Sequence, residues 1–212
     1  MTRSNAQTPP VGFDSIVALI GGGTVLPVIL VLGGCAIVLA SCGTTISNER
    51  ARSELEQSAA TPPVPAAFNY CYGHGCKHVA ATNLNVVEWG KIRGRFDPPA
   101  SDAVEERKNL AIAVGRFENY VGEKLRTKND RGGTFQAYGG YRQLDCVDEA
   151  TNTTTLLRML EHEGHLKWHR VSWPVSRGIF VTGWPHSTAT IKEIQNQRQF
   201  AVDSWFFGLA SV

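Results

Sequence analysis

The spacing of hydrophobic residues from position 84 onward indicates helices first and strands afterwards. Apolar side chains recur every three or four residues over 84–95, over about 22 residues after Asp102, and from Cys146 to about Glu163. This spacing predicts three helices, each with one buried face. After Gly164 the period changes to that of strands. We therefore expect an α+β fold, in which a small antiparallel sheet follows the helices.

Local signals mark the ends of the predicted helices. Asn83 or Asn85 can cap the first helix, and Asp102 with Glu105 three residues later forms a capping-box pattern at the second. Gly164 can end the third helix in the left-handed conformation.

Four strand-like stretches follow the last helix, and residues 195–197 form a hairpin turn between the last two. This hairpin would bring His186 and Asp203 onto neighbouring strands. The stretches lie at about 166–173, 178–183, 186–194 and 199–205.

The first 41 residues differ sharply from the rest. No charged residue occurs from 16 to 41, and this run ends in Leu39-Ala40-Ser41-Cys42. The ending resembles the lipobox of bacterial lipoproteins, which implies cleavage before Cys42 and a diacylated Cys42 thiol. A single uncleaved transmembrane helix of about 25 residues is the alternative.

The sequence predicts three regions along the chain. Residues 1–41 are the signal peptide or membrane anchor, 42–67 a tether with at most a frayed helix, and 68–212 the folded domain. Both readings of the leader place the domain on the periplasmic side of the cell envelope. Gly43 stands where an inner-membrane retention Asp would stand, which favours the outer membrane in a Gram-negative host. The uncleaved helix would instead give a single-pass inner-membrane protein.

The charge composition limits the classes of partner that this protein is expected to bind. The 212 residues include 21 basic and 19 acidic side chains, a net charge of +2, and the basic residues are scattered. We therefore expect no nucleic acid partner. We also expect a monomer that needs no cofactor.

Cys146, His186 and Asp203 are the candidate catalytic residues. Cys146 lies at the start of a predicted helix, where the helix end should lower the pKa of its thiol. His186 and Asp203 lie on the neighbouring strands of the predicted hairpin. A nucleophilic thiol needs an imidazole to take its proton and a carboxylate to fix the imidazole tautomer.

The five cysteines support this choice. Cys35 would leave with the signal, Cys42 would carry lipid, and Cys71 with Cys76 forms a close pair suited to a disulfide. Cys146 is then the remaining thiol. A zinc site from this pair with His74 and His78 is the weaker reading, because the spacing is too tight, so we expect no metal. The histidines at 162, 165 and 169 are expected on the surface.

The segment from 143 to 205 resembles the transglutaminase-like core, a branch of the papain-like fold, and especially bacterial transglutaminase-like cysteine proteinases. The resemblance rests on Asp145-Cys146-Val147-Asp148-Glu149-Ala150, His186 to Ala189, and Ala201-Val202-Asp203. It covers about 60 of the 212 residues. It implies a Cys146 thiolate, a His186 imidazolium, an orienting Asp203, and acyl transfer through a thioester. Pro185 departs from the Gly that often precedes the family's His.

The backbone N–H of Cys146 at the helix end is expected to hold the oxyanion of the reaction, with a side-chain donor from Gln143 or Tyr141. Asp148 and Glu149 in the first turn are expected to act only as helix-capping carboxylates.

Two functions are consistent with these features. The first is a membrane-anchored, extracytoplasmic cysteine hydrolase or transamidase acting on peptide or isopeptide bonds. The second is a non-catalytic lipoprotein of the same fold that binds peptide or envelope polymer, since folds recur without their chemistry.

Overall fold

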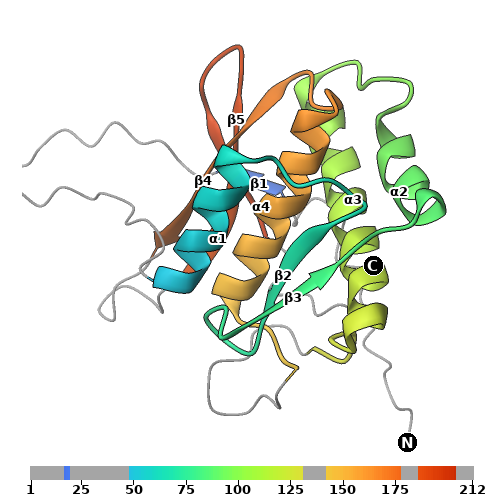
Figure 1. Ribbon diagram of the computed structural model, residues 1–212. Helices are drawn as coiled ribbons and strands as arrows, with labels where there is room; N and C mark the ends of the chain where they lie inside the picture. Colours follow the sequence, from blue (N-terminus) through green and yellow to red (C-terminus); the bar gives the residue numbers. More distant parts are fainter. Residues whose placement is uncertain (1–16, 20–47, 131–141, 178–185, 204–212) are drawn as a thin grey trace, which may run out of the picture.

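The computed structural model describes residues 17–19, 48–130, 142–177 and 186–203, and they form the α+β fold that the sequence predicts (Figure 1). The helices are α1 (Glu49–Ala60), α2 (Val86–Arg93), the 3-10 helix η2 (Gly94–Phe96), α3 (Ala103–Leu125) and α4 (Cys146–His162). The strands are β1 (Val17–Leu19), β2 (Phe68–Tyr72), β3 (His78–Thr82), β4 (His169–Arg177), β5 (His186–Glu193) and β6 (Gln199–Val202).

The strands form two sheets. The larger has the order β1-β6-β5-β4 with antiparallel neighbours, and the smaller is the β2-β3 hairpin. The predicted hairpin of β5 and β6 is present, with Ala189 opposite Val202. The expected strand at 178–183 lies outside the described residues. Strands β2 and β3 were not predicted from the sequence.

Helix α4 is the centre of the fold, in contact with α1, α3, β2, β4 and β5 (Figure 1). Its residues are buried almost from end to end, including a run of threonines. Thr151 and Thr154 donate their hydroxyl hydrogens to the backbone carbonyls four residues earlier, both at 2.7 Å. A polar helix is therefore buried without leaving these hydroxyls unsatisfied.

The predicted helix ends are confirmed. Asn85 caps α2 in a capping box with Glu88, and the Asp102 carboxylate accepts the N–H of Glu105 at 2.7 Å at the start of α3. Helix α4 ends at His162, and Gly164 follows with a positive φ of 75°.

Helix α1 lies in the region 42–67 that the sequence analysis assigned to a tether. The structure shows 12 ordered helical residues whose Ala51 and Leu55 pack against α4 and the Cys71–Cys76 loop. The reason for the difference is that α1 buries only Ala51, Leu55 and Ser58, so its sequence carries little apolar periodicity. Strand β1 likewise falls inside the range 1–41 predicted as leader and pairs with β6.

A buried polar chain joins α3 to the larger sheet. The Glu106 carboxylate accepts the backbone N–H of Lys167 at 2.7 Å and faces His169 Nδ1 at 2.8 Å. Arg107 donates to His169 Nε2 at 3.1 Å and pairs with Glu193. Because Arg can only donate, Nε2 accepts and the ring proton lies on Nδ1, where it donates to Glu106. His169 is fully buried, so its expected place on the surface was wrong.

Among the described residues, no helix is both long enough and apolar enough to cross a membrane.

Candidate active site

Cys146 is the first residue of α4, directly after the N-cap Asp145. Its side chain is largely buried and free of any disulfide. The backbone N–H of Ser187 faces the Cys146 sulfur closely enough to lower the pKa of the thiol. Since Ser187 directly follows His186 in β5, the thiol lies against the start of this strand.

His186 and Asp203 come together as the predicted hairpin requires. His186 opens β5 and Asp203 directly follows β6, and His186 Nε2 is hydrogen-bonded to an Asp203 carboxylate oxygen. Both side chains are mostly buried, at 14% and 15% exposed. The partial shielding from water strengthens this pairing compared with the same pair at the surface.

The pKa of the Cys146 thiol is raised to about 11, mainly by burial. Asp145, Glu149 and Asp203 raise the pKa further, because each carboxylate disfavours a second negative charge, while the Ser187 N–H lowers it. The expectation that the helix end lowers this pKa was therefore wrong. A helix end contributes only about 0.3–1 kcal/mol at most exposed sites, and burial outweighs it here.

Asp148 does more than cap the helix, and Glu149 is buried. The Asp148 carboxylate accepts the Asp145 N–H at 3.1 Å to complete a capping box, and it also accepts two N–H groups of the loop at 71–76.

Glu149 is 5% exposed, and its Oε2 has no hydrogen-bond partner among the described atoms. Burial and the charges of Glu118, Asp130 and Asp203 raise the pKa of Glu149.

The N-cap residue Asp145 accepts the other N–H groups of the first turn of α4 but not the N–H of Cys146. Asp145 takes the N–H groups of Val147 and Asp148 with its carboxylate and that of Glu149 with its carbonyl oxygen. Within the described part of the chain, no acceptor contacts the Cys146 N–H. Such a donor at a helix N-terminus is suited to a developing oxyanion.

The two candidate side-chain donors are placed differently. Gln143 Nε2 donates to the Asn129 carbonyl at 3.2 Å, and the Gln143 carbonyl accepts the Gly73 N–H at 2.9 Å. Tyr141 lies outside the described residues, as does the proposed lipidation site Cys42.

Cys71 and Cys76 form a disulfide, as the sequence predicts. In the residues that the structure describes, no group of three or more His, Cys, Asp or Glu side chains could hold a metal ion.

Sequence reasoning missed Ser187 and the buried acidic residues Glu118 and Asp130. Ser187 acts through its backbone, which leaves no mark in the sequence. Glu118 lies on the predicted long helix among apolar positions, and this placement was the available signal.

Comparisons with protein-family models, with curated proteins and with solved structures find no match to this chain.

Proposed function

We propose that this protein is a cysteine acyltransferase or hydrolase that cleaves peptide or isopeptide bonds through Cys146, His186 and Asp203. The observation that carries the proposal is the junction of α4 with β5. The N–H of Ser187 faces the thiol and lowers its pKa, and the preceding residue His186 is paired through Nε2 with Asp203.

The proposed reaction begins with transfer of the Cys146 proton to His186 Nδ1. The sulfur attacks the substrate carbonyl carbon, and the Cys146 N–H donates to the oxyanion that forms. The His186 proton passes to the leaving amine as its bond to carbon breaks, which leaves a thioester. Water or a second amine then attacks the thioester carbon while His186 takes its proton, the carbon–sulfur bond breaks, and His186 returns the proton to the Cys146 sulfur.

The raised pKa of Cys146 makes His186 indispensable in this scheme. A lone thiolate with a pKa of about 11 would be rare at neutral pH. An adjacent imidazolium offsets this penalty, because the two opposite charges form as one pair. Asp203 stabilises the imidazolium and engages Nε2, which leaves Nδ1 as the ring nitrogen to exchange the proton with the thiol.

We also propose that the protein has a transglutaminase-like fold and lies in the cell envelope. The order of a buried nucleophile helix and a His–Asp hairpin supports a transglutaminase-like, papain-like arrangement. The leader would place the domain on the periplasmic face of the envelope, through a lipid on Cys42 or through an uncleaved helix. Its substrate would then be a peptide or an envelope polymer.

Acyl-enzyme formation from p-nitrophenyl acetate tests the chemistry without knowledge of the substrate. We expect a burst of p-nitrophenol equal to the protein concentration, and an acetyl group on Cys146 by peptide mass spectrometry. Hydroxylamine should release this group, as it releases a thioester. Adding an alkylamine in place of water would distinguish transamidation from hydrolysis.

Three variants provide the controls. Cys146→Ala should lose the burst, His186→Ala should slow it by about 100-fold or more, the scale of a general base, and Asp203→Asn should slow it less. A wild-type protein that acetylates no faster than His186→Ala would overturn the enzyme proposal. That outcome would favour the non-catalytic binding protein.

A further inference from the structure

The disulfide closes a loop with an unusual backbone. Four consecutive residues, 73–76, have positive φ values of 87°, 69°, 68° and 57°. Two of them, His74 and Cys76, are not glycine, so their conformation must be held by surrounding contacts. Successive N–H groups in turn conformations of this kind point into one concavity that favours an anion.

The Asp148 side chain occupies this concavity. Its two oxygens accept the N–H of His74 at 2.8 Å and the N–H of Cys76 at 2.6 Å. The same carboxylate accepts the Asp145 N–H, and its residue is fully buried. One carboxylate therefore joins the disulfide loop to the N-cap of the helix that begins with Cys146.

Two further contacts connect the loop to the same helix and its approach. The Gly73 N–H donates to the Gln143 carbonyl at 2.9 Å, three residues before Cys146. The Asn152 side chain accepts the Cys71 N–H at 2.7 Å and donates to the Cys71 carbonyl at 2.9 Å. The loop thus contacts the chain both before and after the thiol.

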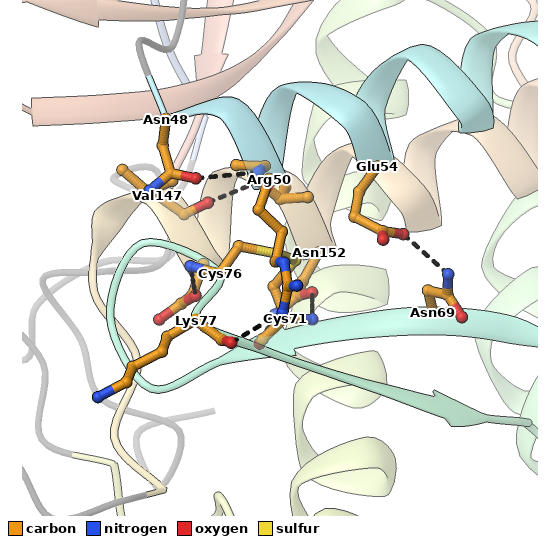
Figure 2. The surroundings of a disulfide bond; sticks show 12 residues. Asn48, Arg50, Glu54, Asn69, Cys71, Cys76, Lys77, Val147 and Asn152 are labelled. Carbon is orange, nitrogen blue, oxygen red and sulfur yellow. Dashed lines mark hydrogen bonds between the residues drawn. A yellow bond between two sulfur atoms is a disulfide. The ribbon is translucent and has the colours of Figure 1, made fainter.

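Helix α1 covers the other side of the loop. Figure 2 shows the disulfide between α1 and α4, with Arg50 reaching the Lys77 carbonyl, a contact of 3.1 Å. Ala51 and Leu55 pack on the disulfide, and both of its cysteines are buried. The buried disulfide therefore contacts both helices, while residues 72–75 between its cysteines stay partly exposed.

We propose that the disulfide-closed loop 71–76 positions the Cys146 thiol through the Asp148 carboxylate, so that reduction of the disulfide by a dithiol lowers the reactivity of Cys146. This inference rests on the proposed function and adds a redox control to the same site. A dithiol would transfer two electrons, becoming a disulfide while Cys71 and Cys76 become thiols. Without the closed ring, the positive-φ run relaxes and Asp148 loses its two loop donors.

The test is the pH profile of Cys146 alkylation by iodoacetamide, followed by peptide mass spectrometry on the full chain. The wild type should react at a constant rate between about pH 6 and 9, as expected for a thiol paired with an imidazole. Cys71→Ala/Cys76→Ala should lower the rate near pH 7 by about tenfold or more and make it rise with pH, and Asp148→Asn should do the same. Wild type reduced with dithiothreitol and then desalted should match the double variant.

The decisive comparison combines both changes. If the loop acts through Asp148, removing the disulfide from Asp148→Asn adds little further loss, whereas independent effects multiply. Asp102→Asn is the matched control, because it changes an N-cap carboxylate at the remote helix α3 and should leave the profile unchanged. Circular dichroism of each variant confirms that the fold persists.

The outcomes separate the two proposals. If His186→Ala changes the profile but the disulfide and Asp148 variants do not, the positioning role is overturned and the proposed function stands. Multiplicative losses in the combined variant also overturn it. If His186→Ala leaves the wild-type profile unchanged, the proposed function itself fails.

Discussion

The backbone N–H of Ser187 faces the sulfur of Cys146 and lowers the pKa of its thiol, so the start of α4 and the start of β5 meet at this thiol. Strand β5 begins at His186, and its neighbour β6 leads into Asp203. The thiol is thereby tied to the His–Asp pair by the backbone of β5, whichever side chain stands at position 187.

The raised pKa of Cys146 predicts the behaviour of the protein without its imidazole. In His186→Ala, the alkylation rate should rise about tenfold per pH unit from pH 7 to 10 without a plateau, because the thiol titrates near 11. Burial disfavours the charged form, so this shift is upward. Stopped-time alkylation with peptide mass spectrometry measures it. A plateau below pH 9 in this variant would contradict the assigned environment.

Replacing two glycines by alanine should change the free energy of unfolding in opposite directions. Gly75 has φ +68°, and a Cβ there would lie 2.8 Å from Asn48 Nδ2, so Gly75→Ala should destabilise the protein by roughly 1–2 kcal/mol. Gly90 lies inside α2 with nothing near its Cβ position, so Gly90→Ala should stabilise by up to about 1 kcal/mol. Urea denaturation of the two variants in parallel measures both signs. Equal effects would argue against the loop conformation.

Removing the Glu106 carboxylate should strongly destabilise the fold. Glu106→Ala leaves the Lys167 and Trp168 N–H groups and the His169 ring without their acceptor in a buried site, at a cost of about 3 kcal/mol. Glu123→Ala is the matched control, since Glu123 pairs with Lys128 on the surface with its side chain 59% exposed. That change should cost no more than about 0.5 kcal/mol. Chemical denaturation at neutral pH gives both values.

Asp148 should make stability fall as the pH rises. Burial and the Asp145 charge raise the folded-state pKa of Asp148 to about 7, above its ordinary value of 3.8. The folded protein therefore binds this proton more tightly than the unfolded chain does. The stabilisation that this proton gives to the folded protein is complete below about pH 4. It is lost progressively as the pH rises to about 7, by at most about 1.4 kcal/mol per pH unit. The raised pKa of Glu149 acts in the same direction.

Asp148→Asn removes this titration, so its free energy of unfolding should depend less steeply on pH between about 4 and 7 than that of the wild type. Urea denaturation at four pH values compares the slopes. Parallel curves would mean that Asp148 has an ordinary pKa in the folded state.

The elements with strong periodicity or caps could be predicted. Helices α2, α3 and α4 and the β5-β6 hairpin have apolar spacing, an Asn or Asp cap, or a turn that acts locally. Helix α1 was expected only as a frayed helix within a tether, because only Ala51, Leu55 and Ser58 are buried and their packing depends on α4 and the disulfide loop. His169 was misplaced because a buried histidine needs partners such as Glu106, which is 63 residues away in the chain.

Some features of the candidate site were predictable from nearby residues in the chain, and others depend on tertiary packing. The sequence by itself determined that Cys146 begins a helix, that a hairpin brings His186 beside Asp203, and that Cys71 and Cys76 form a close pair, because each depends on residues near in the chain. Only the tertiary structure decided that Ser187 contacts the thiol, that burial and carboxylates raise the thiol pKa, and that Asp148 joins the disulfide loop to α4. These relationships arise from packing between distant segments, where burial and Coulomb interactions depend on distances that no local pattern encodes.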